Sequence, residues 1–157
     1  MTYQRGDIVL VPFPFTDLTR TKARPAVIIS SSEFNIASPD IIIAAISSRV
    51  PAKLADTELL LSQTEPGFKA TGLRVDSVVR TTKLYTLTQS LVYNTLGKLN
   101  QQTLGSLDDR LARAIGLPGV GSEMVTRRYL EQQIAELLLR VAELENRLVA
   151  GGKSSAS

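Results

Sequence analysis

Histidine and cysteine are both absent from the 157 residues, which narrows the chemistry open to the chain. Without them, the usual transition-metal ligands and the usual proton carrier near neutral pH are missing. A nuclease mechanism that depends on two histidines is therefore excluded, and we expect neither a metal site nor a cofactor. Any catalysis would rest on arginine or lysine cations, carboxylates, tyrosines and hydroxyl groups.

A group of cations and hydroxyls stands at the ends of two short apolar runs, 26–29 and 41–46. Runs this short and this rich in valine and isoleucine predict buried β-strands. The polar residues at their ends are Arg24, Ser47, Ser48 and Arg49. Ordinary strand ends are polar as well, so these residues alone leave a structural and a functional interpretation equally open.

Residues 12–22 predict a long irregular loop, because two prolines remove backbone donors and the remainder is polar. The segment carries Phe13, Phe15 and Lys22, and exposed aromatic rings among cations suit base stacking and phosphate contact. The alternative is that the rings plug the mouth of a barrel, which we favour for Phe13 more than for Phe15.

The remaining pattern predicts an α+β chain that is mainly β. Strands are expected at 7–11, 26–29, 41–46, 57–61 and 73–87, with a loop at 30–40 and a turn at 63–67. Several short strands separated by turns indicate a small, strongly curved barrel. Leucines spaced 3 and 4 residues apart then predict a helix at 100–117, ending at Gly116 and packing on the barrel.

A second helix is expected at 123–150, after a linker at 118–122 and before a disordered tail at 151–157. Its apolar residues follow a heptad spacing that is typical of coiled coils. They are Leu130, Ile134, Leu137, Val141, Leu144 and Leu148. Arg140 and Glu145 flank this seam at positions that suit an attractive pair in a parallel dimer. Docking of the helix on its own domain is nearly as well supported.

The charge and hydropathy of the chain narrow the expected partners and location of the protein. The net charge is +3, and residues 1–117 carry the whole excess, which weakly favours a polyanionic partner there. No apolar stretch is long enough to span a membrane, and the N-terminus lacks the plan of a signal peptide. We therefore expect a cytoplasmic protein without a membrane partner.

Five segments occur in order between about residues 4 and 117: RGDIVLVPFPFTD, KARPAVII, IIIAAISS, SVVRTTKLYTL and LGKL. Together they resemble the PemK/MazF toxins of type II toxin–antitoxin systems, over a barrel domain that we place at 1–117. The resemblance implies a small SH3-like barrel with a packed helix, usually as a homodimer. It also implies a metal-independent endoribonuclease for single-stranded RNA such as mRNA, and an antitoxin that occupies the RNA-binding groove and binds DNA in complex with the toxin.

The resemblance carries site residues over one position at a time. Arg24 stands at the family's catalytic arginine, Ser47 where a threonine is common, and Arg80 at the second functional arginine. Thr82 departs from the pattern, because many members have an acid there. The implied RNA contacts are Phe15, Thr16, Lys22, Ser48, Arg49, Thr82 and Lys83.

The expected chemistry is attack of a ribose 2′-OH on the adjacent phosphate, with Arg24 as an electrostatic clamp. The proton acceptor stays open, because Asp76 lies four residues from Arg80, about 13 Å along an extended strand. Two alternatives remain. The barrel could be a weakened RNA- or antitoxin-binding module, or the C-terminal helix could regulate or assemble it.

Overall fold

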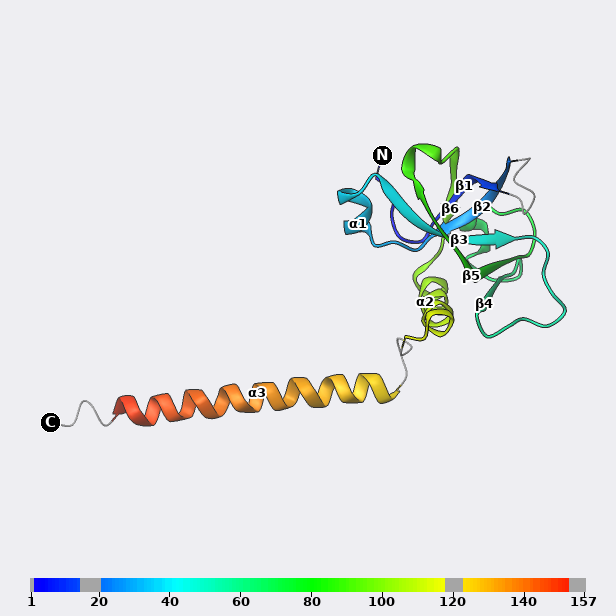
Figure 1. Cartoon of the computed structure of the whole chain (residues 1–157). Coiled ribbons are helices and arrows are strands. Elements are labelled where there is room, and N and C mark those ends of the chain that lie inside the picture. Colours follow the sequence, from blue (N-terminus) through cyan, green and yellow to red (C-terminus); the bar gives the residue numbers. More distant parts are fainter. Residues whose placement is uncertain (1, 15–20, 118–122, 153–157) are drawn as a thin grey trace. The chain divides into compact units, whose positions relative to one another are not determined.

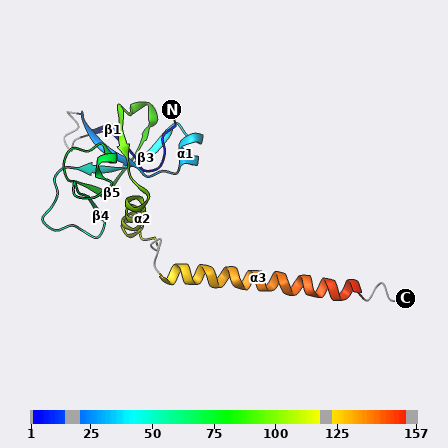
Figure 2. The same ribbon diagram turned by 180° about the vertical axis from the view of Figure 1, so that it is seen from behind.

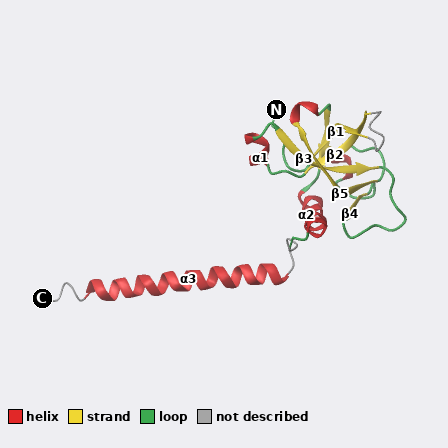
Figure 3. Ribbon diagram, viewed as in Figure 1, coloured by secondary structure: helices red, strands yellow, loops and turns green. Residues whose placement is uncertain are grey.

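A six-stranded antiparallel sheet forms the body of the protein in the computed structural model, which describes residues 2–14, 21–117 and 123–152 (Figures 1 and 3). The strands are β1 (Asp7–Pro14), β2 (Thr21–Ile28), β3 (Asp40–Ser47), β4 (Glu58–Leu61), β5 (Ser77–Thr88) and β6 (Asn94–Lys98). Their order across the sheet is β4-β5-β3-β2-β1-β6, and the sheet curls into a half-barrel. The predicted fold class, a curved and mainly β barrel with helices, is therefore confirmed.

The predicted irregular segment at 12–22 is wrong at both of its described ends, because β1 continues to Pro14 and β2 already begins at Thr21. The carbonyl of Leu10 accepts a hydrogen bond from the N–H of Tyr93, so its backbone faces β6. The backbones of Pro12 and Pro14 face the same side of β1, because they lie two and four residues after Leu10. The pairing with β6 ends at Leu10, so no strand lies beside them on that side in the described sheet. The missing N–H groups of the two prolines therefore fall on an open edge, where a strand tolerates them.

The connection between β2 and β3 was predicted as a loop, but it contains the short helix α1 (Ser32–Ala37). The side chain of Ser31 caps this helix by accepting a hydrogen bond from the N–H of Phe34 at 3.1 Å. Asn35 is buried and donates to the carbonyl of Tyr3, while Ser30 donates to Asn35. These local bonds compensate for the small number of apolar residues in the segment.

Strand β5 is shorter at its start than the predicted 73–87 and is interrupted by a bulge. Ala44 of β3 lies opposite Leu84, but the next residue, Ala45, lies opposite Arg80. Within the described strands, residues 81–83 of β5 therefore have no partner on β3. At this bulge, side chains no longer alternate regularly between the two faces of the sheet. The sequence pattern also missed β6, whose five residues include a glycine.

Two apolar clusters lie on opposite faces of the sheet. One faces α2 (Gln101–Ile115), which contributes the fully buried Leu107. The other is formed by residues of β1, β2 and β3, including Phe13, whose ring meets that of Tyr85 edge-on at 4.9 Å. The prediction that Phe13 is a core residue is confirmed. In both views of the chain, α2 lies beneath the strands (Figures 1 and 2).

Helix α2 lies within its predicted bounds of 100–117, but it begins one residue later and ends two residues earlier. Asn100 caps it by accepting from the N–H of Thr103 at 2.8 Å, and Gly116 ends it with a φ of 74°. A glycine is favoured there because a side chain would be strained in the left-handed region. A salt bridge between Arg5 and Asp108 ties the N-terminal segment to the same helix.

The chain divides into two compact units, Met1–Gly119 and Val120–Ser157. Helix α3 (Glu123–Gly152) makes up the described part of the second unit, and its extent agrees with the predicted 123–150 apart from two added residues. The predicted disordered tail is thus helical at Gly151 and Gly152, while its remainder, like the predicted linker at 118–122, lies outside the described residues. None of the described helices is long and apolar enough to cross a membrane.

Candidate active site

The sheet register brings the three predicted catalytic residues to one face. Ala45 of β3 lies opposite Ala26 of β2 and opposite Arg80 of β5. Residues two apart on a strand point to the same face, so Arg24, two before Ala26, and Ser47, two after Ala45, share the face of Arg80. With about 4.8 Å between strands, Ala26 and Arg80 are about 10 Å apart.

Strands β2 and β3 separate next to these residues. Their pairing covers only Ala26 to Ile28, whereas β1 and β2 pair from Ile8–Val27 to Pro14–Thr21. We call β6, β1 and β2 the β1 arm of the sheet, and β3, β5 and β4 the β3 arm. Arg24 belongs to the β1 arm and is exposed, whereas Ser47 and Arg80 belong to the β3 arm and are partly buried. The candidate site therefore spans the two arms.

The Arg80 guanidinium is held by two partners on its own arm. Its Nη1 lies 3.8 Å from Oε1 of Glu58, the residue opposite it on β4, and its Nη2 donates to the carbonyl of Arg49 at 3.5 Å. The backbone N–H of Arg49 in turn donates to Oγ of Ser47 at 3.2 Å. That bond uses an oxygen lone pair of Ser47 and leaves its hydroxyl proton to donate.

Glu58 is the site residue that the sequence pattern missed. Its side chain is only 14% exposed, and Oε2 accepts from the N–H of Ala55 at 3.0 Å while Oε1 faces Arg80. A strand at 57–61 was predicted, but nothing in the sequence indicated which residue of β5 lies opposite Glu58. An acid inside a predicted strand that is otherwise leucine-rich was the available signal, since such a residue needs a partner.

The described members of the predicted RNA contacts are all exposed, but they lie on three different parts of the sheet. Ser48 and Arg49 follow Ser47 at the end of β3, and both are exposed. Lys22 is exposed on β2 opposite Phe13. The two remaining described members, Thr82 and Lys83, are exposed in the bulge of β5, and neither has a partner on β3 in the described sheet. Phe15 and Thr16 lie outside the described residues.

Asp76 has a structural role instead of one at Arg80. Its Oδ1 accepts a hydrogen bond from the N–H of Gln63 at 2.7 Å, in the loop that follows β4. Gln63 also donates through its side chain to the carbonyl of Arg74 at 2.6 Å. The carboxylate therefore fastens the start of β5 to the loop after β4, which agrees with the prediction that it does not act at the site.

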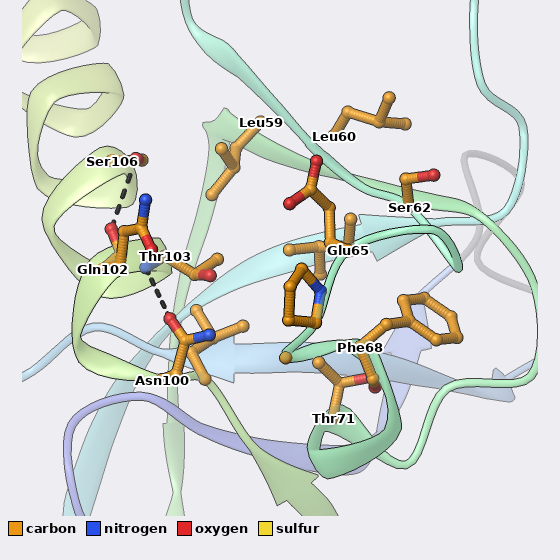
Figure 4. Close-up of a pocket in the computed structure, with 14 residues that line it drawn as sticks. Leu59, Leu60, Ser62, Glu65, Phe68, Thr71, Asn100, Gln102, Thr103 and Ser106 are labelled. Carbon is orange, nitrogen blue, oxygen red and sulfur yellow. Dashed lines mark hydrogen bonds between the residues drawn. The ribbon is translucent and has the colours of Figure 1, made fainter.

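A cavity of about 270 Å³ opens elsewhere in the domain, between β4, the 3-10 helix η1 (Phe68–Thr71) and the first turns of α2 (Figure 4). Leucines and Phe68 form its inner wall, and Asn100 and Thr103 belong to its polar rim. Glu65 is the one ionisable residue in its lining. Arg24, Ser47 and Arg80 do not line it, so this cavity is separate from the cation site.

The Arg80 guanidinium lies against one carboxylate, that of Glu58, and one backbone carbonyl. Across the described ranges, no three acidic side chains come together in a group that could hold a metal ion. The face shared by Arg24, Ser47 and Arg80 presents forked guanidinium donors and a hydroxyl. Such groups suit a phosphate, because arginine offers planar, bidentate donors to its oxygens.

Comparison with protein families identifies the domain. The family described as the PemK-like, MazF-like toxin of type II toxin–antitoxin systems matches residues 4–115. The chain belongs to the PemK/MazF family. The match includes Arg24, Ser47, Glu58 and Arg80 but ends before α3, so this helix lies outside the part that the family shares.

Solved structures of PemK/MazF proteins share the fold of the domain. An endoribonuclease in complex with its cognate antitoxin, from a mycobacterial species, has a TM-score of 0.59 and 19% identity, and the match covers 74% of this chain and 97% of that one. The Mycobacterium tuberculosis toxin MazF-mt6 has a TM-score of 0.58 and 20% identity, covering 71% and 98%. A MazE–MazF structure from Deinococcus radiodurans has a TM-score of 0.58 and 18% identity, covering 75% and 100%. Among curated proteins, none matches the sequence.

Proposed function

We propose that this PemK/MazF chain is the toxin of a type II toxin–antitoxin system and cleaves single-stranded RNA without a metal ion. The observation that carries the proposal is the register of the sheet. It brings Arg24, Ser47 and Arg80 to one face from three different strands, inside the segment that defines the family. The solved relatives named as endoribonucleases support the same activity.

The reaction begins with attack of a ribose 2′-OH on the adjacent phosphorus. A bond forms from the 2′ oxygen to phosphorus and the bond to the 5′ oxygen breaks. Water takes the proton of the 2′-OH and another proton from water reaches the 5′ oxygen, which leaves a cyclic phosphate and a 5′-OH end. Negative charge builds on the phosphoryl oxygens, and Arg24 and Arg80 stabilise it from opposite arms of the sheet. A well-placed donor at such a charge contributes on the order of 3 kcal/mol.

The other two groups have different roles in this proposal. The Ser47 hydroxyl donates to the same phosphate, since its bond to Arg49 leaves the proton available. Glu58 holds the Arg80 guanidinium in place and is a positioning residue. An arginine stays protonated at any physiological pH, so both arginines act as charge stabilisers and not as proton donors.

A cleavage assay with single-stranded RNA in the presence of EDTA tests the proposal. Arg24→Ala and Ser47→Ala should each slow cleavage, by about a hundredfold for Arg24→Ala if one donor contributes on the order of 3 kcal/mol. Matched controls are Arg113→Ala and Ser90→Ala, which remove an exposed arginine and an exposed serine outside the site. Undiminished cleavage by both site variants, or loss of cleavage with EDTA alone, contradicts the proposal.

A binding module without cleavage is the second candidate, and Thr82 is the residue that favours it. If the full chain binds RNA but yields no fragments with 5′-OH ends, this second candidate replaces the first. In either case we propose a cytoplasmic homodimer with an antitoxin partner, which the antitoxin complexes of the solved relatives support. A pull-down with the product of a neighbouring gene for a small acidic protein tests the partner.

A further inference from the structure

Helix α3 carries an apolar seam along most of its length. The seam residues recur at alternating steps of four and three, so they lie on one side of the helix. Each is at least half exposed: Leu130 52%, Ile134 55%, Leu137 58%, Val141 50%, Leu144 57% and Leu148 77%. The seam runs over 19 residues, from Leu130 to Leu148, about 27 Å of helix. A single helix cannot bury its own stripe, so this surface needs a partner.

The order of the residue types along the seam indicates the partner. In the heptad frame, Ile134, Val141 and Leu148 occupy a positions, and the leucines at 130, 137 and 144 occupy d positions. β-Branched residues at a with leucine at d favour two parallel strands over higher oligomers. We propose that α3 pairs with the α3 of a second copy of this chain, as a parallel two-stranded coiled coil.

The flanking charges support a second copy in this orientation. In a parallel pair, Arg140 at a g position meets Glu145 at the e position of the next heptad on the other helix, and the contact occurs twice by symmetry. In an antiparallel pair with the seams aligned, g positions meet g positions and e positions meet e positions. Arg140 would then face its own copy and Glu131 would face Glu145, so like charges would oppose one another.

A charged residue marks the N-terminal end of the seam. Arg127 occupies the a position one heptad before Ile134, and its Nε donates to Glu131 of the same helix at 3.1 Å. The apolar seam therefore begins at Leu130. Leu138, at an e position and 64% exposed, widens the seam on the side that borders the core of a dimer. The family match ends at residue 115, so this pairing would be an addition to the family's barrel.

Disulfide trapping in the full chain tests both the pairing and its direction, because the native sequence has no cysteine. Leu130→Cys and Leu148→Cys are made separately, and Ala142→Cys, on the outer side of the helix, is the matched control. We expect each seam variant to form covalent dimers with itself in an oxidising buffer, whereas the control does not. Cross-linking only in a mixture of the two seam variants indicates antiparallel helices and overturns the proposal. Absence of cross-linking in all samples indicates docking elsewhere and also overturns it.

Charge reversal provides a second test, which examines the charges that flank the seam. In the Leu148→Cys background, Glu145→Arg should lower the effective concentration of the paired thiols about tenfold, measured in a glutathione redox buffer. Adding Arg140→Glu should restore it, because the pair is re-formed with reversed signs. Glu143→Arg makes the same charge change at an outer position and should have little effect. If Glu145→Arg changes nothing, or if the double variant is not rescued, the proposed contact is wrong. RNA cleavage is measured separately, so its loss does not affect either result.

Discussion

Replacement of Glu58 by glutamine isolates the charge that faces Arg80. Glutamine keeps the shape of the side chain and an oxygen that can still accept from the N–H of Ala55. At 3.8 Å, the ion pair has a raw Coulomb energy of about 4 kcal/mol at an effective dielectric constant of 20. The Arg80 side chain is 30% exposed, so screening and desolvation reduce the net interaction to about 1 kcal/mol.

The kinetic consequence of Glu58→Gln should be divided between two parameters. Arg80 loses the charge that orients it, so kcat should fall about fivefold, equivalent to about 1 kcal/mol. A negative charge also leaves the vicinity of the RNA backbone, so KM should fall or stay the same. A merely structural defect would instead lower the fraction of active enzyme, or raise KM as well as lower kcat.

Steady-state cleavage of a short fluorescent RNA measures both parameters. Glu65→Gln is the matched control, because it removes the same charge from an exposed residue at the cavity, away from Arg80. Thermal melting of both variants checks that the fold is intact. An unchanged kcat for Glu58→Gln, or a change equal to that of Glu65→Gln, refutes the reasoning that Glu58 positions Arg80.

Four further variants test the core, the helix cap and the site. Leu107→Ala should lower the free energy of unfolding by about 3 kcal/mol in urea, because this side chain is fully buried under the sheet. Asn100→Ala should cost about 1 kcal/mol in the same assay through loss of the α2 cap, whereas Gln101→Ala next to it should cost little. Arg24→Lys should lower kcat about tenfold and leave RNA affinity nearly constant, since it keeps the charge but loses the forked donor; equal kcat values would contradict this. Thr82→Ala should change kcat less than twofold, because the residue is exposed in the bulge, and a larger loss would assign it a direct role.

Local signals were sufficient to predict the cations and most of the elements that carry them. Ser47 ends a β-branched run and is the last residue of β3, as predicted. Arg24 was expected at the start of a strand, but it lies in the middle of β2, which already begins at Thr21. The α2 helix could be predicted almost to its last residue, since leucine periodicity, Asn100 and Gly116 all act within a few positions. The structure then placed Arg24, Ser47 and Arg80 on one face, as a common site requires.

The features that sequence could not predict depend on contacts between distant segments. From sequence alone, the prolines at 12 and 14 predict a loop. They are compatible with a strand only because β6 pairs with β1 no further than Leu10, which the sequence does not indicate. The bulge in β5 decides that Arg80, and not a residue after it, lies opposite Ala45, and the register between β4 and β5 puts Glu58 opposite Arg80. Alternation along one strand contains no information about such a slip, so Glu58 could not be recognised as the partner of Arg80.

The short pairing between β2 and β3 has a consequence for motion. Only three residue pairs join these central strands, whereas β1 and β2 share seven. Both apolar clusters contain residues of the two arms, so the paired end of these strands cannot open without exposing the core. In the described sheet, Arg24 and Ser47 lie at the other end, where β2 and β3 are not paired. The N–H of Val27 faces β3 beside this unpaired end, so its amide hydrogen exchange should be faster than that of the amides within the β1–β2 ladder. Movement of Arg24 relative to Ser47 would be confined to the unpaired end, while the core holds the paired end in place.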